Sequence, residues 1–407
     1  MAKKYAGGLD ERRALYPEEK AGRFPENPLW VHAVSVGEVQ SAWPLLDLLA
    51  RENPAESVLL STTTATGRET AFHLADGLFG EHIYYPWDVP RIARRSLDRI
   101  RPKGYIVMET EIWPAMLLEL KKRSIPAFLA NGRFSERTAR NVRKRPAFWR
   151  QVYGLFSLLM VRSAADRDVL ADLGVPGKKI RVTGDCKVDA LLLRKQATDL
   201  SRVRRIAGGK APVFVAGSTH RGEEEIVLRA FRIVRERVGG ARLILVPRHP
   251  ERSREVLDLA SGTAGATLLS AVEQRESAGS EPWEILVADK IGVLFDLYGV
   301  SDGAFIGGSL VDKGGQNIME PAAFGIPFSH GPFMRDFVEA AGELGKLGAA
   351  TLVRTDAEMA AHWERCLEKN EREKARLASG AYFQAVGGAA KTTLDEIRRE
   401  MTKNDHQ

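Results

Sequence analysis

A carboxylate near the start of the chain is placed where it could take a proton from a substrate hydroxyl. Glu38 follows the apolar run 29–35, where an expected strand gives way to an expected helix. A general base can work in such a place when the hydroxyl comes within hydrogen-bond reach. The spacing Ser35-Val-Gly-Glu38 is equally that of a capping box, in which the glutamate returns to the helix N-terminus. The sequence leaves both interpretations open.

More polar side chains follow other expected strands in the first half of the chain. Glu109-Thr-Glu111 comes after one apolar run, and Lys187 comes shortly after another. Because the carboxyl ends of parallel strands share one edge of a sheet, these groups are expected near Glu38. The ammonium group of Lys187 could offset negative charge that develops there during a reaction.

Two glycine pairs stand within nine residues in the second half. Gly307-Gly308-Ser309 ends an expected strand, and Gly314-Gly-Gln-Asn317 is expected to open a helix that continues Ile318-Met319-Glu320. Small residues let a backbone approach a ligand, and a helix N-terminus offers N–H groups to an anion. We expect a phosphate or sugar-hydroxyl site here, and two tight packing turns are the alternative.

An arginine lies between two prolines at the end of another expected strand, in Pro247-Arg248-His249-Pro250. Arginine offers a fixed charge and a fork of donors that suits phosphate oxygens. We expect Arg248 to contact an anionic ligand, although a surface ion pair is the commoner use of such a residue. His249 fits a ligand contact and a structural hydrogen bond equally well.

These candidate groups need a scaffold, and the chain predicts one. Short β-rich runs alternate with helix-like stretches throughout, which predicts βαβ units and parallel sheets covered on both faces. The pattern restarts near residue 200. We therefore expect two doubly wound α/β domains, 1–200 and 201–375, facing a central cleft. A helical tail, 376–407, is expected to pack back towards the first domain.

Composition narrows the class of protein further. The chain of 407 residues has only two cysteines, too few for a disulfide scaffold, and a reducing cytoplasm is the default. No apolar run approaches the roughly 20 residues that span a bilayer, so no transmembrane anchor is expected. No Gly-x-Gly-x-x-Gly follows a strand and no P-loop is present, which argues against a dinucleotide cofactor or a P-loop nucleotide site.

The net charge of +7 is unevenly distributed. The first 205 residues hold 35 Lys and Arg against 24 Asp and Glu, whereas the remainder holds 25 against 29. A basic first half suggests a polyanionic partner, which could be nucleic acid, an anionic membrane or a phosphorylated substrate. Solvated helix faces would explain the same charge without any partner.

Seven motifs occur in one order along the chain. Together they resemble the 3-deoxy-D-manno-octulosonic acid (Kdo) transferases of lipopolysaccharide synthesis, over about residues 30–337. The motifs are His32-Ala-Val-Ser-Val-Gly-Glu38, Glu109-Thr-Glu-Ile-Trp-Pro114, Asn131-Gly-Arg133, Gly217-Ser-Thr-His220, Pro247-Arg-His-Pro-Glu-Arg252, Gly307-Gly-Ser309 and Asn317-Ile-Met-Glu-Pro321.

The resemblance implies a metal-independent, inverting glycosyltransferase of the GT-B fold, with two Rossmann-like domains. It implies that Kdo moves from CMP-Kdo to a phosphorylated glucosamine lipid, a lipid A precursor of the lipid IVA type. No cofactor, no metal and no nucleic-acid partner are expected. The expected location is peripheral, on the anionic cytoplasmic face of the inner membrane.

The resemblance also implies roles for single residues. Glu38 matches the general base, and Glu109 and Lys187 match positions that stabilise the transition state. The positions expected to bind the nucleotide sugar are Pro247, Arg248, His249, Ile291, Gly292, Val293, Gly308, Ser309, Asn317, Ile318, Met319 and Glu320.

The chain departs from the family pattern at several positions. Gln316 stands where the family typically has histidine, and Val293 stands where it typically has glutamate. The family's Gly-Asn-x-Lys is Gly184-Asp-Cys-Lys187 in this chain. Two alternatives therefore stay open. One is a diverged GT-B paralogue with another nucleotide sugar or acceptor, and the other is a non-catalytic basic protein that binds anionic lipid or nucleic acid.

Overall fold

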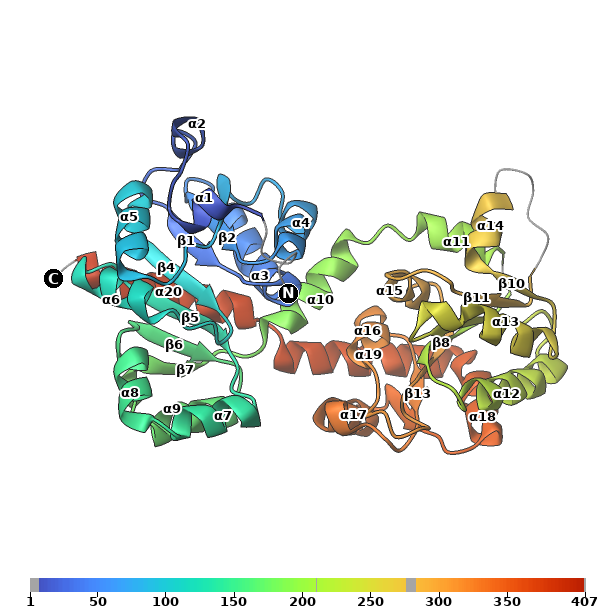
Figure 1. Cartoon of the computed structure of the whole chain (residues 1–407). Helices are drawn as coiled ribbons and strands as arrows, with labels where there is room; N and C mark the ends of the chain where they lie inside the picture. The colour runs from blue at the N-terminus through green and yellow to red at the C-terminus, as the bar shows by residue number, and fades with distance from the viewer. Residues whose placement is uncertain (1–6, 210, 276–282, 406–407) are drawn as a thin grey trace. The chain divides into compact units, whose positions relative to one another are not determined.

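The computed structural model describes residues 7–209, 211–275 and 283–405, and these form two compact units (Figure 1). Unit 1 comprises the chain up to Leu193 and again from Val386, and unit 2 spans Arg194–Ala385. The first boundary was expected at residue 200, but it falls inside helix α10 (Cys186–Ala197). The tail was expected to begin at residue 376, and the chain re-enters unit 1 at residue 386.

Unit 1 is built on a parallel sheet of seven strands in the order β3-β2-β1-β4-β5-β6-β7. The strand order reverses between β1 and β4, so side chains that follow these two strands meet at a topological switch point. The strands are β1 (Leu29–His32), β2 (Val58–Thr62), β3 (Glu81–Tyr84), β4 (Gly104–Met108), β5 (Ala127–Gly132), β6 (Leu158–Val161) and β7 (Ile180–Val182).

Nearly every strand residue of this sheet is buried, because helices cover both of its faces. Trp30 and Tyr105 contribute to the core on one face, and Val31 and Ile106 contribute to the core on the other. The continuous apolar runs in the sequence reflect this two-sided burial. The helices of unit 1 are α1 (Leu9–Arg12), α2 (Glu18–Ala21), α3 (Val36–Glu52), α4 (Ala65–Leu74), α5 (Pro90–Ile100), α6 (Pro114–Lys122), α7 (Glu136–Arg143), α8 (Pro146–Gly154), α9 (Ala164–Asp172), the 3₁₀ helix η2 (Gly177–Lys179), most of α10, and α20 (Ala389–Asp405).

The last helix of the chain is an integral part of unit 1. Leu394 and Ile397 of α20 lie in the core beside α3. The carboxylate of Asp189, on α10, accepts the N–H groups of Gly388 and Ala390 at 2.7 Å each. This carboxylate satisfies donors at the start of α20, which would otherwise lack partners within the helix.

Unit 2 repeats the plan with a second parallel seven-stranded sheet, in the order β10-β11-β9-β8-β12-β13-β14. Its order reverses between β8 and β12, which makes a second switch point. The sequence predicted five of these strands but neither β10 nor β13. The strands are β8 (Val213–Thr219), β9 (Arg242–Pro247), β10 (Ala266–Leu268), β11 (Ile285–Val287), β12 (Gly303–Ile306), β13 (Phe328–His330) and β14 (Ala350–Leu352).

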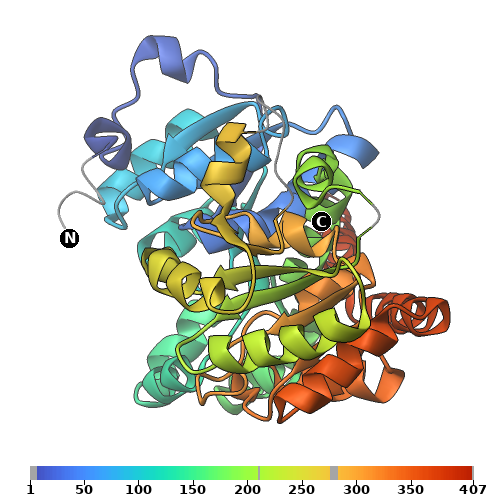
Figure 2. The same ribbon diagram turned by 90° about the vertical axis from the view of Figure 1, so that its right-hand side faces the viewer.

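Helices also cover both faces of this sheet. Figure 2 shows α12, in yellow-green, beside α18, in orange-red, in front of the sheet. No helix within the described ranges is long and apolar enough to cross a membrane. The helices of unit 2 are α11 (Ser201–Ala207), α12 (Glu224–Arg237), η3 (Pro250–Arg252), α13 (Ser253–Ser261), α14 (Leu269–Arg275), α15 (Leu294–Tyr298), α16 (Met319–Phe324), η4 (Arg335–Phe337), α17 (Val338–Leu347), α18 (Asp356–Cys366) and α19 (Lys369–Val386).

Candidate functional site

A group of charged side chains lies at the carboxyl edge of the unit 1 sheet. Glu38 is in the first turn of α3, directly after β1, and Glu109 directly follows β4, the neighbouring strand. Lys187 is at the start of α10, and its Nζ lies 2.8 Å from Oε1 of Glu109. The hydroxyl of Ser41, one turn after Glu38 on α3, donates to the same Glu109 oxygen at 3.3 Å. The three expected catalytic residues of unit 1 thus share one edge.

The Glu38 carboxylate is buried and returns towards the strand that precedes it. Its Oε2 accepts the N–H of Val34 at 2.8 Å, and the Ser35 hydroxyl donates to Oε1 at 3.4 Å. The pKa of Glu38 is raised to about 8, mainly by burial and to a smaller extent by the nearby carboxylates of Glu111 and Glu109. This is not the expected capping box, because Glu38 bonds the N–H of Val34 and the Ser35 side chain caps no N–H group of α3. The raised pKa of Glu38 suits proton transfer near neutral pH.

Glu111 completes the carboxylate group on this edge. Burial, followed by the charge of Glu109, raises the pKa of Glu111. Three carboxylates that repel one another are costly to keep ionised together. Lys187 offsets part of this cost, because its ammonium group pairs with Glu109.

The position of Lys187 depends on Asn131, which belongs to one of the family motifs but has no role assigned from the sequence. Asn131, at the end of β5, has a φ of 56° and is fully buried. Its Oδ1 accepts the N–H of Cys186 at 2.9 Å, and Asp185 accepts the N–H of Lys187 at 3.0 Å. These two side chains hold the first turn of α10, so the Asn131-Gly-Arg133 motif supports the site through the backbone of another helix.

Unit 2 contains a cavity of about 480 Å³ at the carboxyl ends of β8, β9 and β11, beside the segment that leads into α16. Its volume is in the range of small-molecule sites. Of the residues expected to bind a nucleotide sugar, seven line it. They are Pro247, Arg248, His249, Ile291, Gly292, Asn317 and Glu320.

Other residues that line the cavity are not among those expected to bind a nucleotide sugar. Some of them belong to features noted in the sequence, and others do not. Ser218 lies near the end of β8, inside the Gly217-Ser-Thr-His220 motif, and Gln316 is one of the departures from the family pattern. Arg194 and Tyr298 lie within helices, where their residue types carry no signal. Ser218 has a φ of 56°, an uncommon conformation for a residue with a side chain.

Five of the expected binding residues do not line the cavity. Ile318 is fully buried in the core, and Val293 precedes the first turn of α15. The Met319 sulfur accepts the Tyr382 hydroxyl at 3.8 Å. The remaining two, Gly308 and Ser309, are held by an internal carboxylate.

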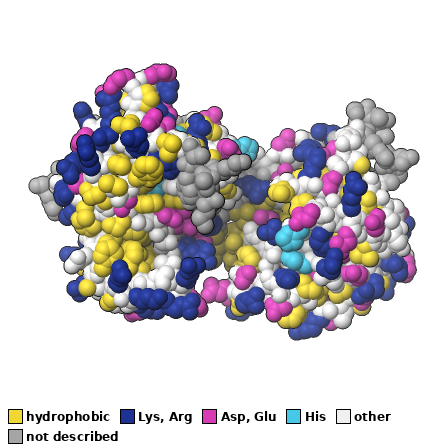
Figure 3. Space-filling model, in the orientation of Figure 1, with side chains coloured by type: hydrophobic (Ala, Val, Ile, Leu, Met, Phe, Trp, Pro, Cys, Tyr) yellow, Lys and Arg dark blue, Asp and Glu magenta, His cyan; other side chains and the backbone are white. Residues whose placement is uncertain are grey.

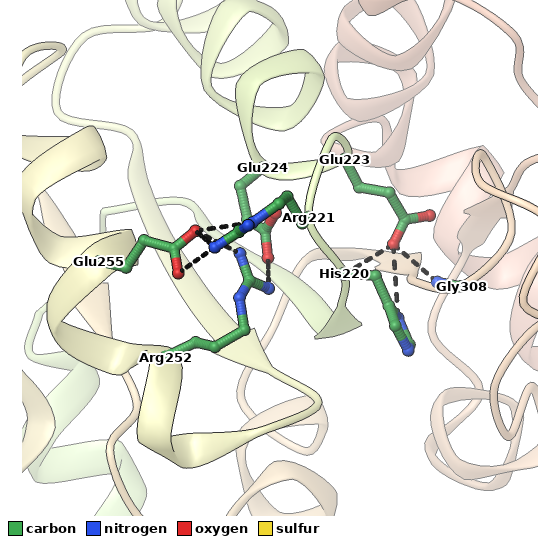
Figure 4. Close-up of polar contacts among 7 residues, drawn as sticks. All are labelled: His220, Arg221, Glu223, Glu224, Arg252, Glu255 and Gly308. Carbon is green, nitrogen blue, oxygen red and sulfur yellow. Dashed lines mark hydrogen bonds and ion pairs between the residues drawn. The ribbon is translucent and has the colours of Figure 1, made fainter.

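That carboxylate belongs to Glu223, which has no exposed surface (Figure 4). Its Oε2 accepts the N–H groups of His220 and Gly308 at 2.9 and 2.7 Å. Its Oε1 accepts those of Ser309 and Leu310 at 3.0 and 2.9 Å. The N–H groups of this glycine turn therefore already hold an anion, one supplied by the protein. They are not offered to a ligand, contrary to the expectation from the glycine pattern.

The second glycine pair also differs from its expected role. The helix expected to open at Gly314 begins only at Met319, and the N–H of Gly315 donates to the carbonyl of Gly308 at 2.8 Å. The polar group at the start of α16 is the side chain of Asn317. Its Oδ1 accepts the N–H of Met319 at 3.1 Å, and its Nδ2 donates to Glu320 at 3.3 Å.

The arginines that follow β8 and β9 have different partners. Arg252 and Arg221 share the carboxylate of Glu255, and Arg252 also bonds Glu224 at 2.8 Å (Figure 4). These two arginines are therefore occupied within unit 2. Within the described ranges, the exposed guanidinium of Arg248 forms no ion pair or hydrogen bond. Arg248 remains available to an anionic ligand.

No group of three or more His, Cys, Asp or Glu side chains is placed to hold a metal ion in the part of the chain that the structure describes. Two acidic residues in an Asp-x-Asp spacing, Asp166 and Asp168 on α9, bond within the protein, and Asp168 pairs with Arg167 at 2.8 Å. Asp166 accepts the N–H of Phe134 at 2.6 Å and bonds the Ser163 hydroxyl, as expected near a helix N-terminus.

The architecture is shared with solved proteins that bind nucleotide sugars. The UDP-GlcNAc 2-epimerase of Neisseria meningitidis, solved with UDP-GlcNAc, matches with a TM-score of 0.61 at 14% identity, over 92% of this chain and all of that one. This likeness concerns the fold alone. Two tandem Rossmann-like units with sites at their strand carboxyl ends define a protein of the GT-B class, which confirms the expected fold class.

The sequence comparisons identify the family within this class. Residues 7–190 match the family model "3-Deoxy-D-manno-octulosonic-acid transferase (kdotransferase)". The 3-deoxy-D-manno-octulosonic acid transferase of Haemophilus influenzae is 32% identical over 98% of this chain and 93% of its own length. The corresponding transferase of Bordetella pertussis is 33% identical over 91% and 86%. The chain belongs to the Kdo transferase family of glycosyltransferase enzymes, as its motifs predicted.

Proposed function

We propose that this protein transfers Kdo from CMP-Kdo to a hydroxyl of a phosphorylated glucosamine lipid, a lipid A precursor. Two relatives that it matches over most of its length carry the name 3-deoxy-D-manno-octulosonic acid transferase. The observation that carries the proposal is the buried carboxylate of Glu38, whose pKa is raised to about 8 beside the Lys187–Glu109 pair. Such a group accepts a proton from a hydroxyl near neutral pH.

In the proposed reaction, Glu38 takes the proton of the acceptor hydroxyl. The acceptor oxygen forms a bond to the anomeric carbon of Kdo, while the bond from that carbon to the phosphate oxygen breaks. CMP leaves with the electron pair, and the anomeric configuration inverts because the oxygen attacks from the face opposite the phosphate. Lys187 and Glu109 are proposed to stabilise the charge that develops in this step.

The unit 2 cavity is the proposed donor site. Arg248 would bind the phosphate, since its guanidinium is exposed and unpaired within the described ranges. Asn317 and Glu320, already joined by a hydrogen bond, offer oxygen and nitrogen atoms to ribose hydroxyls. Ile291 is 87% exposed at the cavity, which suits an apolar contact to the nucleotide.

The acceptor is proposed to bind unit 1 through its phosphates. Lys and Arg side chains gather along the edge of unit 1 that carries α7–α9 (Figure 3). This basic edge also fits the anionic cytoplasmic face of the inner membrane, which attracts clustered cations. Its exposed basic residues include Arg133, Arg137, Arg140, Arg143, Lys144, Arg145 and Arg150.

The proposal is tested by incubating the purified protein with CMP-Kdo and the tetra-acylated lipid precursor, with mass spectrometry of the product. A mass gain of one or more Kdo units is expected. Glu38→Gln should lose about two orders of magnitude or more in rate, as is typical for removal of a general base. Glu69→Gln, which changes an exposed carboxylate on α4, is the matched control. If Glu38→Gln keeps near-normal turnover, Glu38 only holds the backbone that precedes α3.

A diverged paralogue with another nucleotide sugar is the second candidate, because Gln316 lines the donor cavity. Thermal shift with CMP, UMP, UDP and GDP separates the two candidates. Stabilisation by CMP above the others supports Kdo transfer from CMP-Kdo. Stronger stabilisation by a uridine nucleotide supports the paralogue.

A further inference from the structure

Arg194 is a cationic residue of the unit 2 cavity that no motif or matched position assigns. It is the first residue of unit 2, on α10, and its half-buried side chain lines the cavity together with Arg248 and Glu320. A charged residue within a helix usually faces solvent. Arg194 instead faces a cavity that is proposed to bind a dianionic sugar nucleotide.

An aromatic ring holds the Arg194 guanidinium in place. Its central carbon lies 4.1 Å from the centroid of the Phe295 ring, on α15, and Phe295 is almost fully buried. Stacking on a ring uses the flat face of the guanidinium and leaves its N–H groups, which lie at the edge, free to donate. The donors are thus oriented before any ligand arrives.

Among the described residues, the positive charge of Arg194 is not paired with a neighbouring carboxylate. Within the described residues it forms no ion pair, although Asp296 and Glu320 are close enough for its charge to act on them. That charge lowers the pKa of both carboxyl groups, but burial outweighs it and the pKa of each is raised overall. In the part of the chain that the structure describes, no carboxylate forms an ion pair with Arg194 of the kind that Glu255 forms with Arg221.

A third cation at the cavity, unlike Arg194, is paired with a carboxylate. Lys290 also lines the wall, but its ammonium group is paired with Glu273 on α14. Arg248 and Arg194 are therefore the two guanidinium groups that the cavity can turn towards a ligand. The donor named in the proposed function has two anionic groups as well, the phosphodiester and the carboxylate of the sugar.

We propose that Arg194 is a second anion-binding residue of the donor cavity, which binds an oxyanion of the sugar nucleotide alongside Arg248. The oxyanion is either the phosphate or the sugar carboxylate, because both accept the forked donors of a guanidinium. This inference rests on the proposed function, in which a CMP-sugar occupies the cavity. Because Arg194 is partly buried, its interaction with an anion is screened less than that of an exposed residue.

The test compares Arg194→Gln with wild type in three measurements. Calorimetric titrations give the Kd for cytidine and for CMP, and steady-state transfer gives the KM for freshly prepared CMP-Kdo. The loss of a charged hydrogen bond predicts a weakening of about ten- to a hundredfold for the ligand that carries the oxyanion. The control is Lys195→Gln, which removes the next cation on α10. Lys195 is exposed, lies 5.9 Å from the Phe324 ring and does not line the cavity, so its variant should stay within about twofold of wild type.

The three ligands distinguish the two oxyanions. Weaker binding of CMP with unchanged binding of cytidine assigns Arg194 to the phosphate. Unchanged binding of CMP with a raised KM for CMP-Kdo assigns it to the sugar carboxylate. Equal loss for cytidine and CMP, or no change for any ligand, overturns the inference, because a purely structural role would not depend on the anion.

Two further outcomes show whether only the inference fails or whether the proposed function fails with it. If wild type binds CMP tightly but Arg194→Gln does so equally and has a normal KM, only the inference fails. If wild type binds no cytidine nucleotide, both fail. Should Arg194→Gln not fold, Arg194→Lys replaces it, because lysine keeps the charge but loses the fork. A severalfold weakening is then expected, and wild-type values would overturn the inference.

Discussion

The ammonium group of Lys187 lies 2.8 Å from Oε1 of Glu109, on the same sheet edge as Glu38. The charge of Glu109 raises the pKa of Glu38, and Lys187 opposes that charge. Lys187→Met should therefore move the pKa seen in the rate profile upwards, by up to about one unit. The variant should also lose about tenfold or more in kcat, because an uncompensated carboxylate disfavours negative charge in the transition state. The measurement is kcat/KM as a function of pH.

Two further variants test the direction of this pKa shift. Glu109→Gln removes the repelling charge, so the pKa in the rate profile should move down. Lys103→Met breaks the ion pair between Lys103 and Glu56, away from the site, and should leave the profile unchanged. A downward shift in Lys187→Met would show that the ion pair does not act on Glu38.

The pH dependence of the wild-type rate follows from the state of Glu38. A general base must be ionised to accept a proton, and burial raises the pKa of Glu38 to about 8. We expect kcat/KM to rise with pH, about tenfold per pH unit below pH 8, and to level off above it. Glu38→Gln should lack this ionisation in its residual activity. A profile that is flat between pH 6 and 8 would contradict the assignment of Glu38 as the base.

The same raised pKa makes a separate prediction about stability. A carboxyl group whose pKa is higher in the folded state stabilises the fold while it is protonated, and this contribution is lost as the pH rises through about 8. Glu38→Gln keeps a neutral group at every pH. The Tm of the variant relative to wild type should therefore increase between pH 5 and pH 9, by about 2–4 °C for each kcal/mol involved. A difference that is constant with pH, measured by scanning calorimetry, would show that burial does not perturb Glu38.

Much of the fold could be predicted because its strands are buried on both faces. Runs such as 105–108 and 285–287 are uninterrupted apolar stretches, which is what a covered parallel sheet requires. Strand β13 was missed because it reads Phe-Ser-His and has two buried polar residues. The Ser329 hydroxyl reaches the carbonyl of Ala304 and His330 bonds the carbonyl of Gly331, so contacts outside the strand make their burial possible.

The site was predictable where its residues follow strands. Glu38, Glu109 and Arg248 all follow strand ends, and parallel topology brings such positions to one edge of each sheet. Arg194 follows no such rule, since it lies inside a helix. The role of Glu223 was equally hidden, because its carboxylate bonds to backbone N–H groups some 85 residues further along the chain. Such a contact depends on the tertiary structure and has no local signature.

Removal of the Glu223 carboxylate should destabilise unit 2. Each of its oxygens accepts two backbone N–H groups, and Gln would replace one of those oxygens with an NH₂ group that cannot accept. With one to two buried donors left unsatisfied, Glu223→Gln should cost about 2–4 kcal/mol in the free energy of unfolding. Urea titration measures this cost. Glu236→Gln, an exposed change on α12, the helix that Glu223 precedes, is the control and should stay within about 0.5 kcal/mol of wild type.

A close approach between two neighbouring strands gives the last prediction. A Cβ at Gly307, which follows β12, would lie 2.3 Å from the carbonyl oxygen of Ser218 on β8. Ser218 lines the donor cavity, so Gly307→Ala must displace backbone at the cavity wall. We expect a loss of about 1–3 kcal/mol in unfolding free energy.

The same substitution should weaken CMP binding, because the displaced backbone belongs to the cavity itself. Gly342, within α17, has open space around its Cβ position, and Gly342→Ala should be neutral or stabilising by up to about 1 kcal/mol. Urea titration and CMP calorimetry on both variants provide the comparison. If Gly307→Ala matches Gly342→Ala in both measurements, β8 and β12 can accommodate a Cβ at residue 307, and the position of Ser218 does not depend on Gly307. If stability falls while CMP affinity is unchanged, the contact shapes the sheet but Ser218 plays no part in binding the donor.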